Sequence, residues 1–159
     1  MRHFLILGLV LATGACSDDG GGDDDGTSYN CAEETRDDEF VTGLAKPGEL
    51  GVYEVKLLAS DPAPPSRGDN TWTVELSTVA APVAPVSGAT LRATPFMPDH
   101  AHGSGKTVLV TPMTAAGQYQ LAPVNLWMPG LWEVTIQAEA TGAGGTQRDR
   151  VVFRFCLPS

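Results

Sequence analysis

Proline and glycine recur along this chain at intervals too short for long helices. The 159 residues include 12 Pro and 18 Gly, and both residue types weaken a helix interior. Between them lie short runs in which apolar and polar side chains alternate, as in a half-buried strand. The runs that we predict as strands are Tyr53–Ala59, Thr71–Thr78, Thr90–Phe96, Lys106–Thr111, Gln118–Asn125, Leu131–Ala138 and Arg150–Cys156, with Glu39–Thr42 as a short edge strand.

This pattern predicts an all-β protein, an antiparallel β-sandwich of seven or eight strands. Strands spaced by about 8–12 residues with turn residues between them are typical of such sandwiches. Trp72, Val74 and Leu76 alternate with polar residues, so we expect them to point inward. Because proline cannot donate a backbone hydrogen bond, Pro123 predicts an edge position or a bend. The Gly-rich segment Ala140–Asp149 predicts a mobile hairpin connection.

The N-terminus is typical of an exported bacterial lipoprotein. A basic start and the apolar run Phe4–Ala12 predict a signal peptide over residues 1–15, because nine apolar residues fall well short of the ~20 that span a bilayer. Small residues precede Cys16, an arrangement that resembles a lipobox and predicts a lipid anchor on that cysteine. Thr13 stands where the lipobox usually has an aliphatic residue. The alternative is an ordinary secretory signal cleaved at Ala15 or later.

Residues 16–30 are predicted to form a disordered, acidic linker. They are mostly Gly, Asp and Ser, and no buryable side chain occurs before Tyr29, so the segment cannot bury enough apolar surface to fold. A lipid on Cys16 with this linker behind it would hold the folded domain off a membrane, since two or three acyl chains give durable anchoring. The prediction is an envelope protein of the outer or inner membrane that faces the periplasm or the cell surface.

Cysteine spacing predicts one disulfide. If Cys16 carries lipid, the two remaining cysteines are Cys31 and Cys156, which lie near the two ends of a domain over residues 31–159. An oxidising compartment favours their pairing over free thiols or a metal pair. In the chain-entropy model a loop of this length contributes roughly 4–5 kcal/mol.

Charge and motif content exclude some classes of function. The formal net charge is −9, and no basic patch is present, so we do not expect nucleic acid as a partner. Carboxylates are scattered. Asp99, His102 and Ser104 lie within six residues, but such a set is more typical of a polar loop than of a catalytic triad. We therefore predict no enzymatic activity and no small-molecule substrate.

One short segment combines the side chains that copper prefers. His100 and His102 lie two residues apart and Met97 precedes them closely, so the imidazoles share a face if the segment is extended. Imidazole and thioether suit copper, and thioether favours Cu(I). Met113 and Met128 are weaker candidates for completing the site. The alternative is that the histidines are merely solvated and Met97 fills the core.

Six short motifs follow one another in the centre of the chain. They are Gly51–Val55, Gly68–Val74, Pro85–Ala89, Phe96–Gly103, Gly117–Tyr119 and Met128–Val134. In this order, over Gly51–Ala138, they resemble the YtkA-like domain, which is related to FixH-type periplasmic domains.

The resemblance implies an immunoglobulin-like sandwich in a bacterial envelope protein, commonly a lipoprotein. FixH-like relatives are linked to the assembly of copper-containing respiratory oxidases, so the resemblance implies a copper ion with Met97, His100 and His102 as first ligands. The expected function is a lipid-anchored module that binds copper or delivers it to an acceptor. The alternative is a metal-free interaction module for an envelope protein partner.

Overall fold

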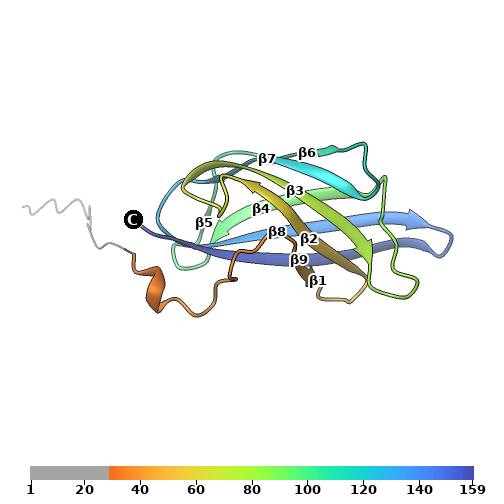
Figure 1. Cartoon of the computed structure of the whole chain (residues 1–159), viewed down its shortest axis with the longest axis horizontal. Coiled ribbons are helices and arrows are strands. Elements are labelled where there is room, and N and C mark those ends of the chain that lie inside the picture. The colour runs from red at the N-terminus through yellow and green to blue at the C-terminus, as the bar shows by residue number, and fades with distance from the viewer. Residues whose placement is uncertain (1–28) are drawn as a thin grey trace, which may run out of the picture.

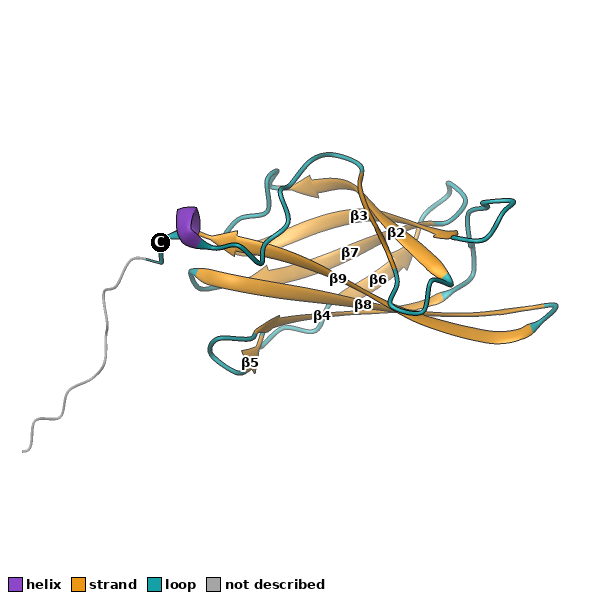
Figure 2. Ribbon diagram, turned by 90° about the horizontal axis from the view of Figure 1, so that it is seen from below, coloured by secondary structure: helices purple, strands orange, loops and turns teal. Residues whose placement is uncertain are grey.

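Two antiparallel β-sheets packed face to face form the part of the chain that the structure describes. A computed structural model describes residues 29–159 (Figure 1), with one sheet in the order β1-β2-β3-β7-β6 and the other in the order β5-β4-β8-β9. Figure 2 shows the two layers from the side. The strands are β1 (Leu44–Pro47), β2 (Tyr53–Asp61), β3 (Gly68–Thr78), β4 (Thr90–Met97), β5 (His102–Gly103), β6 (Leu109–Pro112), β7 (Gln118–Leu126), β8 (Gly130–Gly142) and β9 (Gly145–Leu157).

The predicted all-β antiparallel sandwich is confirmed, and residues 29–159 hold nine strands where seven or eight were expected. Helical structure in residues 29–159 is one 3-10 turn, Cys31–Glu33, and no helix there is long and apolar enough to cross a membrane. The predicted signal peptide, the lipid site Cys16 and the linker up to residue 28 lie outside the described residues.

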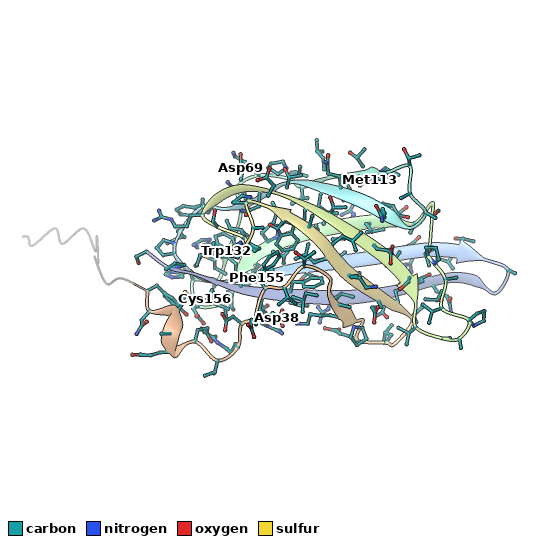
Figure 3. The ribbon with its side chains drawn as sticks, viewed as in Figure 1. Asp38, Asp69, Met113, Trp132, Phe155 and Cys156 are labelled. Atoms are coloured by element: carbon teal, nitrogen blue, oxygen red, sulfur yellow. A yellow bond between two sulfur atoms is a disulfide. The ribbon has the colours of Figure 1, made fainter. Side chains whose placement is uncertain are left out.

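Alternating side chains build the core as the sequence pattern predicts. Trp72, Val74 and Leu76 of β3 have no exposed surface. The Trp72 indole packs edge-on against the rings of Phe153 and Phe155, with centroids 6.2 and 5.6 Å apart. Phe155, labelled in Figure 3, is itself a buried core residue. Each such fully buried apolar side chain contributes roughly 1.5–3 kcal/mol, so this core is the main source of stability.

Two predicted strands are placed differently by the structure. Glu39–Thr42 is not a strand; the edge strand is β1, which starts after a turn at Gly43 with a φ of +87°. Phe40 packs instead against the Phe155 ring, with centroids 6.1 Å apart, so its apolar side chain serves as an anchor for a connecting segment. The run predicted at Lys106–Thr111 begins later, as β6.

The β8–β9 hairpin is longer than the sequence predicts. Its pairing continues through the Gly-rich segment to Gly142 opposite Gly145, because ladder hydrogen bonds need only backbone groups. At Pro123, where an edge position or a bend was predicted, the pairing of β7 with its neighbours is interrupted. There β7 leaves its partner β6 after Ala122, and its register with β3 shifts between Asn70 and Trp72.

The predicted disulfide between Cys31 and Cys156 is present. It joins the start of the described chain to β9, the edge strand of its sheet. Further along, Asp38 N–H donates to the Arg154 carbonyl (2.7 Å), and Arg154 N–H donates to the Asp38 carboxylate (2.8 Å). The N-terminal segment therefore covers part of an edge that would otherwise present unpaired backbone groups.

Candidate functional site

Met97 and His102 are direct partners in the β4–β5 pair. Pro98 follows the end of β4, and Ala101 turns the chain back with a φ of +53°. Directly opposed residues of an antiparallel pair point to the same face, with Cβ atoms about 4.5–5.5 Å apart. Since Met97 faces the core with no exposed surface, the His102 side chain is directed to the same inner side at the end of the sandwich.

Aromatic rings surround His102. Trp127 stacks on its imidazole, with centroids 5.5 Å apart and planes 24° apart, and Trp132 meets it edge-on at 6.4 Å. The His100 ring lies 5.8 Å away, measured between centroids. His102 Nδ1 is 3.2 Å from the Gly103 carbonyl oxygen. A proton on Nδ1 would donate to that oxygen and leave Nε2 free to bind a metal.

The Met97 thioether fits against a glycine. A Cβ on Gly130 would come within 2.7 Å of the Met97 methyl carbon and 3.6 Å of the Tyr29 ring. Gly130 also has a φ of +122°, which side chains rarely adopt. Gly130, in the motif Met128–Val134, is therefore the residue that makes room for the Met97 side chain.

An ion-pair network fixes the loop between β4 and β5. Arg36 donates from both terminal nitrogens to the Asp99 carboxylate, at 2.8 and 2.7 Å, and also binds Glu34. This hydrogen bonding from Arg36 holds the pKa of Asp99 below its usual range. Burial, together with a hydrogen bond to Glu34, raises the pKa of Tyr29 to about 12. His100 directly follows Asp99 in the chain, so the contact between Arg36 and Asp99 also attaches His100 to the N-terminal segment.

The other two methionine candidates lie in different places. Met128 is half-buried beside the core, and its carbonyl oxygen accepts a 2.9 Å hydrogen bond from Trp132 Nε1. Met113 follows β6 and pairs with Gln118 at the start of β7, whereas Trp127 follows the end of that nine-residue strand, roughly 30 Å away. Figure 3 shows Met113 at the end of the sandwich opposite Trp132. The structure therefore does not bring Met113 to the other candidates.

A polar network borders the same end of the sandwich. Ser104 donates its hydroxyl to Asn125 (3.2 Å), and Asn125 donates its amide to Asp69 (2.6 Å). Asp69 also binds Lys106, and this hydrogen bond lowers the pKa of its carboxyl. Ser104 is directed toward Asn125, so this network does not link the Ser104 hydroxyl to His102.

We call Met97, His100 and His102 the Met/His cluster. Its donors, one thioether and two imidazoles, are those that copper prefers. Within residues 29–159, no group of three or more His, Cys, Asp or Glu side chains is arranged to hold a metal ion. Sequence reasoning missed Arg36 and Trp127 as neighbours of the cluster. Arg36 carries no local signal, because its partner Asp99 lies 63 residues further along the chain.

Comparison with known families settles the class of the domain. The family model described as YtkA-like matches residues 48–137, more than half of the chain. The chain belongs to the YtkA-like family. The match to the YtkA-like model includes the Met/His cluster and Trp127, while Cys31, Arg36 and Cys156 lie outside it. Neither curated proteins nor solved structures give a match.

Proposed function

We propose that this YtkA-like protein binds Cu(I) at the Met/His cluster and carries it within the bacterial envelope. The observation that carries the proposal is the cross-strand pairing of Met97 with His102. That pairing puts a thioether and an imidazole on one face, and His100 lies 5.8 Å from His102 between ring centroids. One thioether and two imidazoles form a small donor set that suits a soft cation such as Cu(I).

The three side chains differ in exposure, which favours a carrier over a closed structural site. Met97 is fully buried, His102 is half-buried and His100 is exposed. In this proposal Met97 and His102 bind the ion from inside the protein. During transfer, a ligand from the acceptor protein replaces His100. Trp127, stacked on His102 and 48% exposed, shields the site from bulk water.

The YtkA-like domain and the Cys31–Cys156 disulfide indicate an extracytoplasmic protein. We propose that residues 1–15 are its signal peptide, that lipid on Cys16 anchors it to the membrane and that the acidic linker gives the domain reach. A carrier held near a membrane would meet membrane-bound copper acceptors at high effective concentration.

Titration of the purified protein with Cu(I), kept reduced without thiols, tests this proposal. We expect near one-to-one binding in the wild type and its loss in the variant with both His100→Ala and His102→Ala. Met113→Leu is the matched control, because Met113 lies at the far end of the sandwich, and it should bind copper like the wild type. No uptake, or uptake unchanged by the histidine substitutions, would refute the proposal.

A metal-free interaction module is the second candidate function, and the exposed Trp127 favours it. Tryptophan is enriched at the centres of protein interfaces, and this one lies at the rim of the sandwich with 48% of its surface exposed. An envelope protein partner would bind Trp127 and the His100 loop. The copper titration separates the two candidates, since a metal-free module binds no Cu(I) at the histidines.

A further inference from the structure

The segment Cys31–Asp38, here called the strap, is fixed at both ends to β9. The disulfide to Cys156 fixes its first residue. At its last residue, Asp38 exchanges two hydrogen bonds with the Arg154 backbone, and Lys46 Nζ binds the Asp38 carboxylate at 2.6 Å. Figure 3 shows Cys156 and Asp38 along the same side of the sandwich.

The middle of the strap binds the loop that contains His100. Arg36 forms two parallel hydrogen bonds with Asp99, at 2.8 and 2.7 Å, and is itself fixed by Glu34 at 2.8 and 2.7 Å. Such a bidentate contact fixes orientation as well as distance. Tyr29, just ahead of the strap, adds a 3.3 Å hydrogen bond from its hydroxyl to Asp99.

We infer that the strap is a redox-sensitive clamp that holds the His100 loop in its copper-binding geometry. This inference rests on the proposed function, whose site it would regulate. Both cysteines are half-exposed, so a dithiol reductant can reach the bond. The dithiol supplies two electrons and two protons; the Cys31–Cys156 bond breaks, two thiols form and the dithiol becomes a disulfide.

Reduction would remove the covalent fixing and leave the strap attached through Asp38. The Arg36 guanidinium is then oriented less rigidly toward Asp99. The loop that contains Asp99 and His100 becomes more mobile. A looser loop must be ordered again when it binds an ion, and that ordering lowers affinity. The Met/His cluster of the oxidised protein therefore binds copper more tightly than the cluster of the reduced protein does.

Hydrogen exchange without metal tests the mechanical part of the inference. The double variant Cys31→Ser with Cys156→Ser lacks both the bond and the thiols, which would themselves bind Cu(I). We expect its backbone amides at residues 99–102 to exchange faster than in the wild type. Arg36→Ala should do the same with the disulfide intact, which separates release of the loop from loss of folding. Arg148→Ala breaks an exposed ion pair with Glu139 on the β8–β9 hairpin and should change nothing there.

Competition with a chromophoric Cu(I) chelator, with the full chain in detergent, tests the effect on copper. We expect affinity about tenfold weaker, or about 1.4 kcal/mol, in the cysteine variant and in Arg36→Ala. The combination of Arg36→Ala with Asp99→Asn should be no weaker than either single change, because both remove one contact. The Arg148→Ala control should match the wild type.

The outcomes distinguish the two claims. If the wild type binds Cu(I) and the strap variants bind it equally well, the clamp is refuted and the copper site stands. If the wild type binds no Cu(I), the proposed function fails and the clamp fails with it.

Discussion

Met97 and His102 oppose each other across the last pair of β4 and the two-residue strand β5. Their register brings a fully buried thioether and a half-buried imidazole to one face at the end of the sandwich. The pairing depends on a turn at Ala101 and on the space that Gly130 leaves for the Met97 methyl group. Each of these dependences can be tested.

Gly130→Ala should destabilise the protein by about 1–3 kcal/mol, because the added methyl overlaps the Met97 side chain and Gly130 has a positive φ. Gly144→Ala is the control, since a Cβ there meets nothing within 4 Å, and it should stay within about 0.5 kcal/mol of the wild type. Urea unfolding measures both. Equal stability of the two variants would show that Gly130 does not limit the position of Met97.

Asp149 should make the folding stability of the protein depend on pH in the acidic range. Burial alone would raise its pKa, but backbone N–H donors at Leu50, Tyr53, Arg150 and Val52 together outweigh this and lower the pKa. A folded pKa below the unfolded one gives stability that is present above about pH 4 and lost as pH falls through the folded value.

Asp149→Asn should therefore cost about 1–3 kcal/mol near pH 7 and flatten the decline in stability below about pH 4. Unfolding curves at several pH values measure this. An equally steep acid decline in the variant would assign the pH dependence to other carboxylates.

Trp127 should report on the cluster through its fluorescence. Its ring stacks on His102 at 5.5 Å, so an ion bound to that imidazole is expected to quench its emission. Trp127→Phe should remove most of the copper-induced change while leaving the thermal midpoint nearly unchanged, because the residue is 48% exposed. A full-sized signal in the variant would trace the quenching to Trp132 or Trp72.

Cys16→Ser should release the protein from membranes with the Cys31–Cys156 disulfide intact. The expectation follows from the cysteine count: if Cys16 carries lipid, Cys31 and Cys156 remain to form the disulfide with each other. Fractionation of cells followed by thiol labelling under denaturing conditions measures both parts. Retention of the variant in the membrane fraction would refute the lipid anchor.

The strands were predictable where local alternation alone decides the outcome. Trp72, Val74 and Leu76 show a strict period of two and are fully buried. Glu39–Thr42 has no such period, because its two apolar residues are adjacent. The positive φ at Gly43 turns the chain there, and β1 begins one residue later. A strand of two residues such as β5 carries no period, so its pairing with β4 was not predictable.

The candidate site was predictable only as a set of residue types. The spacing of His100 and His102 placed them together, but whether a methionine joins them depends on strand register and order. The register of β4 and β5 pairs Met97 with His102, while the length of β7 separates Met113 from both histidines. The Arg36–Asp99 contact spans 63 residues, and no local pattern predicts a contact of that kind.

X-ray absorption at the copper edge of the Cu(I)-loaded protein identifies the ligand atoms and so tests directly whether Met97 and His102 bind the ion. We expect a mixed shell of nitrogen and sulfur in the wild type. In Met97→Leu, which preserves the volume of the buried side chain, the sulfur contribution should disappear while the nitrogen remains. A shell without sulfur in the wild type, or sulfur that persists in Met97→Leu, would contradict the assignment of Met97 and His102 as a copper pair.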